Sequence, residues 1–254
     1  MKVRILGCGT SSGVPRIGND WGSCDPAEPR NRRGRVSILV EHEETRILVD
    51  TGPDLREQLL NAEVTRVSAV LWTHDHADHC HGIDDLRQLF HAQGSPVAGY
   101  SRPDTLATLE ERFAYIFEGK GGYPPVATAE VLPDRLRIGG IDVAVVDQPH
   151  GDITSAGLRF DAGGASIGYS TDANGLTEEM ESLFQGVDVW IVDALRQRPH
   201  PTHAHLDETL GWIDAVQPKR AILTHMDQSM DYRTLLAELP EGVEPGYDGM
   251  EVML

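Results

Sequence analysis

The feature that most constrains this sequence is the stretch Thr73–His79 (THDHADH), which combines three imidazoles with two carboxylates. It follows Ala69–Trp72, an apolar run typical of a buried strand, and it precedes a helix-like segment. So many ionisable side chains at the end of a strand are incompatible with core packing. Neutral imidazole and carboxylate are ligands of zinc, manganese and iron. The stretch therefore predicts a metal site.

Further residues of metal-binding type recur downstream, each after another strand-like apolar run. They are His150 after residues 141–146, Asp172 after residues 165–169, and His225 after residues 220–223. Together with the first stretch they provide six or seven nitrogen and oxygen ligands. That number is enough for two metals that share a bridging carboxylate. The pattern alone does not say which residue binds which metal.

Composition and charge exclude several classes of protein. The formal net charge of −18 argues against a general binder of nucleic acid or anionic membranes, because both need a basic surface. No apolar run approaches membrane-spanning length, and the first residues lack the apolar segment of a signal peptide. Cys8, Cys24 and Cys80 are far apart, which does not suggest disulfides or a thiolate zinc site. We expect a cytoplasmic protein with no membrane partner, and a homodimer is compatible with the sequence.

Apolar patterning predicts a mixture of strands, hairpins and helices in one domain over residues 1–254. The expected strands cover 3–6, 36–40, 46–49, 69–72, 141–146, 158–160, 165–169, 187–192 and 220–223. The expected helices cover 54–60, 83–93, 105–117, 206–216 and 232–239. Both halves begin with strands. This order favours an α/β fold with two layers of sheet flanked by helices over a doubly wound parallel sheet.

The glycine-rich loop 7–15 is the first candidate for contact with a substrate. Its residues 9–13 fit the GxSxG pattern, but Val14 and Pro15 follow where a nucleophile elbow requires a helix. A phosphate-binding Walker loop is excluded because the Gly-Lys-Ser/Thr ending is missing. The free amides and the hydroxyls of Ser11 and Ser12 would suit an anion. A purely structural tight turn is an equally compatible interpretation.

A basic cluster in this acidic chain is the second candidate. It comprises Arg30, Arg32, Arg33 and Arg35. Guanidinium groups suit phosphate and carboxylate, so Arg30 and Arg33 are assigned as candidate substrate ligands. Pairing with the many acidic residues of the surface is the alternative.

The ligand pattern resembles that of a known superfamily. HxHxDH at 74–79, the later His150 and Asp172, and the final Thr224-His225 together resemble the metallo-β-lactamase-fold hydrolases, which implies an αββα sandwich of two mixed sheets. Within the superfamily, the opening GCGTSSGVP resembles the tRNA 3′-processing endonucleases and the phosphoribosyl cyclic phosphodiesterases. The segments GIDDLR at 82–87 and HPTH at 200–203 favour the second, PhnP-type group.

The resemblance implies a role for each ligand. It places His74, His76 and His150 on one metal, Asp78, His79 and His225 on the other, and Asp172 between them. Asp50 would orient the ligand loop, and His203 would face the scissile phosphate. His200 and His205 flank His203, and either could take that role.

The implied activity is hydrolysis of a small or cyclic phosphodiester, such as a phosphoribosyl cyclic phosphate, by an enzyme with two divalent ions, zinc or manganese. A metal-bridging hydroxide would be the nucleophile, and His203 and Asp78 would be the catalytic side chains. Two alternatives share the fold. A tRNA 3′-processing endonuclease is disfavoured by the net charge of −18 and by the lack of a basic inserted arm. A thioester or lactone hydrolase would differ in its substrate loops.

Overall fold

The computed structural model describes all 254 residues, and its strands form two seven-stranded mixed sheets. In spatial order, the first sheet contains β14 (Glu251–Met253), β1 (Lys2–Gly7), β2 (Ser37–His42), β3 (Thr45–Val49), β4 (Ala69–Trp72), β5 (Gly99–Ser101) and β6 (Glu130–Val131). The second contains β13 (Val243–Pro245), β12 (Ala221–Thr224), β11 (Val189–Asp193), β10 (Ala165–Ser170), β9 (Ile153–Ala162), β8 (Ile141–His150) and β7 (Arg135–Ile138). In each sheet, parallel pairing covers one half and antiparallel pairing the other.

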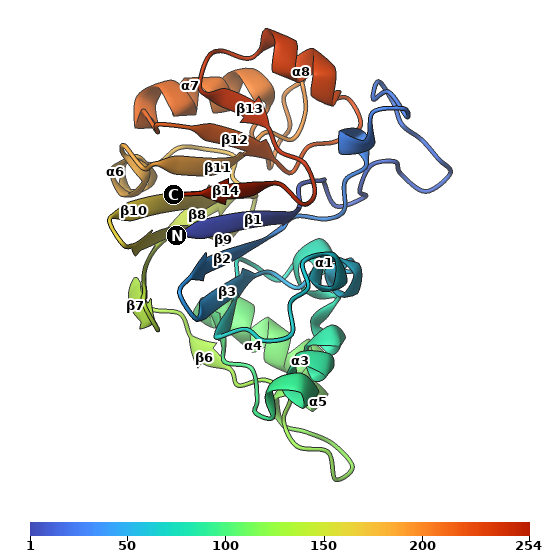
Figure 1. Cartoon of the computed structure of the whole chain (residues 1–254), viewed down its shortest axis with the longest axis vertical. Coiled ribbons are helices and arrows are strands. Elements are labelled where there is room, and N and C mark those ends of the chain that lie inside the picture. Colours follow the sequence, from blue (N-terminus) through green and yellow to red (C-terminus); the bar gives the residue numbers. More distant parts are fainter.

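The two sheets pack face to face, and helices cover their outer faces (Figure 1). The first sheet is covered by α1 (Leu55–Asn61), α3 (Leu86–Gln93), α4 (Pro103–Arg112) and α5 (Ala114–Phe117). The second is covered by α6 (Glu178–Phe184), α7 (Leu206–Val216) and α8 (Tyr232–Glu238). The short helices η1 (Pro29–Asn31), α2 (Ala77–Cys80) and η2 (Ile83–Asp85) lie in connecting loops. This is the αββα sandwich expected from the sequence, and the prediction of two mixed sheets flanked by helices is confirmed.

Alternation along the central strands explains why they are apolar throughout. In β4, Ala69 and Leu71 join the core between the sheets, whereas Val70 and Trp72 join the core under the helices. The same division holds in β3, where Leu48 faces the helices. Successive side chains of a strand point to opposite faces, so a strand in the middle layer must be apolar on both. Such strands are rigid, and the ends of these strands can hold functional side chains in fixed positions.

Several predicted elements differ in detail from the structure. The single helix expected over 105–117 is divided into α4 and α5 at Phe113, whose φ of −122° and ψ of 34° are not helical. The apolar spacing continues through this break and therefore does not show it. The strand expected over 141–146 extends to His150 at the end of β8. The short strand β14, which pairs with β1 close to the N-terminus, was not predicted. No helix is long and apolar enough to span a lipid bilayer.

Candidate metal centre and active site

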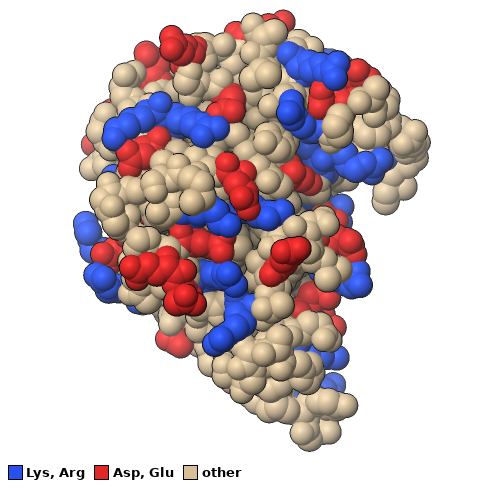
Figure 2. All heavy atoms as spheres, viewed as in Figure 1, with Lys and Arg blue, Asp and Glu red and all other residues tan.

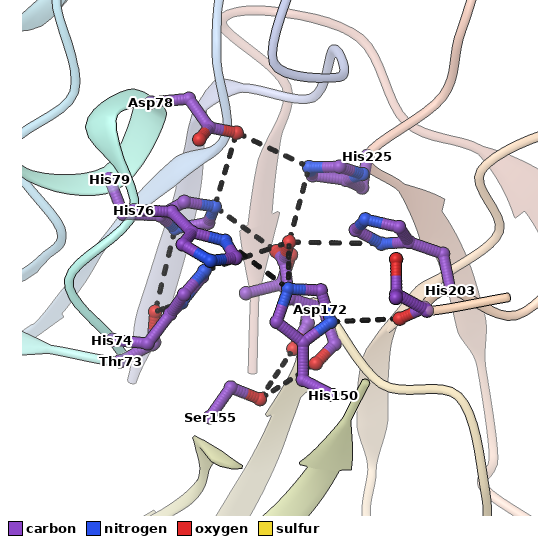
Figure 3. Close-up of polar contacts among 12 residues, drawn as sticks. Thr73, His74, His76, Asp78, His79, His150, Ser155, Asp172, His203 and His225 are labelled. Atoms are coloured by element: carbon purple, nitrogen blue, oxygen red, sulfur yellow. Dashed lines mark hydrogen bonds and ion pairs between the residues drawn. The ribbon is translucent and has the colours of Figure 1, made fainter. Parts of the chain in front are cut away.

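The candidate ligands come from four separate strand ends, which the fold brings to one point (Figure 3). The loop after β4 and the single turn of α2 supply the residues from His74 to His79. His150 ends β8, Asp172 follows β10, and His225 follows β12. Every ligand predicted from the sequence therefore lies at the same edge of the sandwich. The exposed His76 and the partly exposed His203 mark the side where this cluster meets solvent.

One ligand group consists of His74, His76 and His150, whose donor atoms all lie within 4.8 Å of one another. His150 Nε2 is 3.3 Å from His76 Nδ1. The other ring nitrogen of His150, Nδ1, donates a hydrogen bond of 2.8 Å to the carbonyl of Thr202. This bond fixes the tautomer and leaves the lone pair of Nε2 directed at the site. The group has the three-imidazole composition of a zinc or manganese site.

The second ligand group consists of Asp78, His79 and His225. Asp78 Oδ2 is 3.4 Å from His79 Nε2 and 3.6 Å from His225 Nε2. The far nitrogen of His79, Nδ1, donates to the fully buried Asp50 across 2.8 Å. Asp50 also accepts hydrogen bonds from the backbone N–H and the hydroxyl of Thr73. Asp50 therefore orients the ligand loop from behind and does not face the centre.

The carboxylate of Asp172 lies between the two groups. Its Oδ2 is 3.1 Å from His79 Nε2, and its Oδ1 is 3.5 Å from His225 Nε2. Oδ1 is also 3.7 Å from His150 Nε2 and 3.9 Å from His74 Nε2. The two oxygens thus reach imidazoles of both groups, as a bridging carboxylate requires.

Unpaired buried nitrogens support occupation of this centre by metal. The Nε2 atoms of His74, His79 and His225 are buried and have no hydrogen-bond partner. Buried polar atoms are rarely left without a partner, because desolvation of an unpaired nitrogen costs about 1–3 kcal/mol. These three nitrogens belong to the two ligand groups, and the donor set suits divalent ions. The residues present therefore fit two such ions.

The protonation states of three of these residues also favour metal binding, whereas His79 and His225 would each release a proton to a metal because, against the lowering effect of burial, Asp172 raises their pKa values. Burial, followed by repulsion from His79, holds the pKa of His74 well below its ordinary value, and burial lowers the pKa of His150. Burial alone would raise the pKa of Asp172, but His225 and His79 hold it well below its ordinary value. Neutral imidazoles and an ionised bridging carboxylate are the forms that bind a cation.

His203 lies beside the centre but is held by a different residue. Its Nδ1 donates to Asp193 Oδ2 across 3.0 Å, and its ring stacks on His225 with centroids 4.7 Å apart. Asp193 is fully buried at the end of β11, and it also accepts the backbone N–H of Ala173. We did not predict a role for Asp193 from the sequence, although it ends a strand as the ligand residues do. Since Nδ1 of His203 is occupied, its Nε2 remains for a substrate.

The two histidines that flank His203 have other partners. The Nδ1 of His205 is 3.2 Å from Glu208 in the first turn of α7, so this imidazole is directed at its own helix. His200 Nδ1 accepts the backbone N–H of Thr202, and its ring is 5.1 Å from that of His203. Of the three histidines considered from the sequence, His203 is the one that contacts the rings of both His150 and His225.

The predicted substrate ligands outside this cluster have different environments. Ser11 and Ser12 are exposed in the loop after β1, where their hydroxyls are accessible. Arg30 is exposed, and its guanidinium lies over the rings of Tyr232 and Tyr247. The interpretation of Arg33 as a substrate ligand is wrong, because this residue is 2% exposed.

The guanidinium of Arg33 instead joins two segments of the chain. It donates to the carbonyls of Met230 at 2.6 Å and Asp227 at 3.3 Å. These hydrogen bonds tie the loop between β1 and β2 to the loop after β12. Arg33 therefore has a structural role, and the sequence could not distinguish it from its exposed neighbours in the basic cluster.

Comparison with known proteins identifies the class. A model of the beta-lactamase superfamily domain matches residues 45–226, which is more than half of the chain. The chain therefore belongs to the metallo-β-lactamase superfamily, and this membership together with the ligand set makes it a metal-dependent hydrolase.

A solved structure narrows the assignment. A diphosphatase of the PhnP family superposes on this chain with a TM-score of 0.90 and 31% sequence identity, over 99% of this chain and 97% of that chain. The protein is a member of the PhnP family, which confirms the resemblance seen in its sequence motifs.

Curated relatives have several names. An octanoyltransferase from Porphyromonas gingivalis is 29% identical over 261 residues, and the match covers 100% of this chain but 52% of that protein. The chain thus spans about half the length of this relative. A ribonuclease Z from Kineococcus radiotolerans is 30% identical over 149 residues, which cover 54% of this chain and 46% of the enzyme. The names of these two relatives describe different activities, so the similarity in sequence does not by itself identify a substrate.

Proposed function

We propose that the protein is a dinuclear metal-dependent phosphodiesterase that hydrolyses a small or cyclic phosphodiester. The observation that carries this proposal is the position of Asp172 between two complete ligand groups, with His203 beside them. Two divalent cations, zinc or manganese, would supply positive charge for a phosphate anion and would lower the pKa of a bound water. No protein nucleophile is then required, and none is offered within the cluster.

The side chains of this protein would complete the chemistry. His203 is partly exposed, and its free Nε2 can donate a proton to a leaving alkoxide or a hydrogen bond to a phosphate oxygen. Asp193 holds the imidazole in one orientation. Asp78 and Asp172 would hold the cations and would offset part of their charge. A site that keeps net positive charge in an otherwise acidic protein selects an anionic substrate.

The similar solved structure is that of a diphosphatase, so a phosphoanhydride is a second substrate type for this centre. Hydrolysis of a diester and of a diphosphate both involve attack of water on phosphorus, and the same cation pair would serve both reactions. The leaving groups differ, since a diester releases an alkoxide that needs a proton and a diphosphate releases a phosphate. The shared part of the proposal is hydrolysis at a phosphorus centre.

The test combines metal analysis with a choice of substrates. Protein purified without chelator should contain about two divalent ions per chain and hydrolyse bis(p-nitrophenyl) phosphate, and dialysis against a chelator should abolish both. An acyl thioester and a precursor tRNA with a 3′ trailer serve as competing substrates. Turnover of the thioester or the precursor tRNA in preference to every small phosphodiester would refute the proposal.

A further inference from the structure

The break between α4 and α5 places two side chains against the ligand loop, residues 73–81. Arg112 is the last residue of α4, and Phe113, where the helical conformation is interrupted, precedes α5. The ring of Phe113 meets the ring of His81 edge to face, with centroids 5.8 Å apart. His81 directly follows α2, which carries Asp78 and His79. The junction of α4 and α5 therefore contacts the end of the ligand loop.

Arg112 contacts the beginning of the same loop at Asp75, which lies between the proposed ligands His74 and His76. Its Nη1 donates a hydrogen bond of 2.6 Å to the carbonyl oxygen of Asp75, and its Nη2 lies 2.9 Å from Oδ2 of the carboxylate. The buried thiol of Cys80 donates to the same carbonyl across 3.3 Å. The guanidinium thus binds Asp75 at two points, and its planar fork is already shaped for such a contact.

The charge of this pair does not by itself distinguish it. Acidic and basic side chains alternate over much of the face shown in Figure 2, so ion pairs are common on this surface. The side chain of Arg112 is 45% exposed, and an exposed ion pair contributes little to the stability of a protein. Arg87 pairs with Asp84 at nearly the same exposure, 46%, but it makes no hydrogen bond to the ligand loop. The bond from Arg112 to the backbone of Asp75 is the distinctive contact, because it fixes the course of the loop.

His76 is the proposed ligand that most needs such support. Three other ligand imidazoles have a polar partner on the nitrogen that points away from the centre, namely His74 with Thr73, His79 with Asp50, and His150 with Thr202. The Nδ1 of His76 faces His150 (Figure 3), and its other nitrogen has no hydrogen-bond partner. The side chain of His76 is also exposed. Partners that orient a ligand imidazole typically contribute about 10- to 100-fold in metal affinity, and His76 has no such partner of its own.

From these observations we infer that Arg112 is a positioning residue for the metal centre. It acts through Asp75 and holds His76 in place, as polar partners hold the other imidazoles. The inference rests on the proposed dinuclear centre, and it gives the junction of α4 and α5 a role in the metal affinity of the first ligand group. The second ligand group depends less on Arg112, because His79 has its own partner in Asp50.

Zinc titrations of matched variants test the inference. Binding is measured in competition with a chromophoric chelator, and His76→Ala and Asp78→Ala identify the steps that belong to the first and the second ligand group. We expect Arg112→Gln to weaken the first step by about 10-fold or more and to leave the second nearly unchanged. Arg87→Gln removes the same charge from a side chain of matching exposure and should change neither step.

A lysine at position 112 separates the two-point contact from the charge. Arg112→Lys keeps the positive charge but cannot place two donors in the geometry of a guanidinium fork, so the first step should remain weakened. Wild-type zinc affinity in Arg112→Lys would overturn the inference. Equal losses in both steps of Arg112→Gln, or a loss of the same size in Arg87→Gln, would overturn it as well.

A measurement on the metal-free protein separates this inference from the proposed function. Hydrogen exchange of the backbone amides in residues 76–81 should be faster in Arg112→Gln than in the wild type or in Arg87→Gln, because the loop has lost its contact with α4. Neither exchange nor zinc titration requires turnover, so both would uphold the role of Arg112 even if the protein hydrolyses no phosphodiester. Unchanged exchange in Arg112→Gln, or faster exchange without a selective loss of zinc affinity, would refute the inference even if diesters are hydrolysed.

Discussion

Replacement of His203 by alanine tests whether this side chain acts on the leaving group. Its Nδ1 is held by Asp193 at 3.0 Å and its ring stacks on His225, so the imidazole is fixed beside the centre without being one of the seven proposed ligands. A positioned general acid typically contributes 10² to 10⁴ in rate. We therefore expect His203→Ala to lower kcat by about 10² or more for a diester with an alkoxide leaving group.

The structure also predicts how the loss of activity in a second variant, Asp193→Asn, compares with the loss in His203→Ala. Asp193→Asn keeps the shape of the side chain but weakens a charge-assisted hydrogen bond, which is worth about 1.5–3 kcal/mol. That energy corresponds to a loss of about 10- to 100-fold. Asp193→Asn should therefore be less damaging than His203→Ala, and the double variant should be no worse than His203→Ala, because Asp193 acts through His203.

The assay compares leaving groups at constant metal content. An alkoxide needs a proton as it departs, whereas p-nitrophenolate does not, so the loss in His203→Ala should be much smaller with bis(p-nitrophenyl) phosphate. Elemental analysis should show the same metal content as in the unmodified protein. Equal losses with both leaving groups would show that His203 binds phosphate rather than donating a proton. A fall in metal content would show that His203 is a ligand.

Three further predictions concern the metals, the basic cluster and a buried carboxylate. Asp172→Ala and His225→Ala should each reduce the metal content from about two ions per chain toward one by elemental analysis, and full retention in both would contradict the bridging arrangement. Arg33→Met should lower the free energy of unfolding in urea by about 3 kcal/mol, because it leaves the carbonyls of Met230 and Asp227 unpaired, whereas a substrate role would change KM and not stability. Burial raises the pKa of Asp248 from 3.8 to about 6, so its contribution to stability is present below pH 4 and is lost as the pH rises through 6. The wild type should lose about 2.4 kcal/mol more than Asp248→Asn between pH 4 and 7 in urea titrations, and parallel curves would contradict this.

The centre of the fold and the proposed ligands could be predicted from the sequence for the same physical reason. A strand that is buried on both faces must be apolar throughout, so polar residues such as His74, Asp172 and His225 are conspicuous where each strand ends. The ligand groups lie at such ends. The apolar runs in the sequence therefore locate the central strands, and the polar residues that end each run locate the proposed ligands. Short edge strands such as β14 have no such signal, since three residues are too few to show a period.

The basic residues were harder to interpret because their roles depend on contacts between distant segments. Arg33 and Arg30 are three residues apart, yet one is buried against residues 227–230 and the other lies over tyrosine rings on the surface. Arg16 and Arg198 meet across a cavity although 182 positions separate their numbers in the chain. Local composition identifies a group of arginines but not the partners that decide their function.

Backbone conformation provides an independent reason to regard the centre as functional. Asp50, Asp172 and His225 have φ values of 65°, 55° and 59°, in the left-handed region that favours glycine. Such conformations cost of order 1–3 kcal/mol each in a residue with a side chain. Glycine would relieve the strain at all three positions, but it would remove the proposed bridging carboxylate, one proposed imidazole ligand and the acceptor that orients His79. The strain at these three converging strand ends therefore indicates a site that uses their side chains.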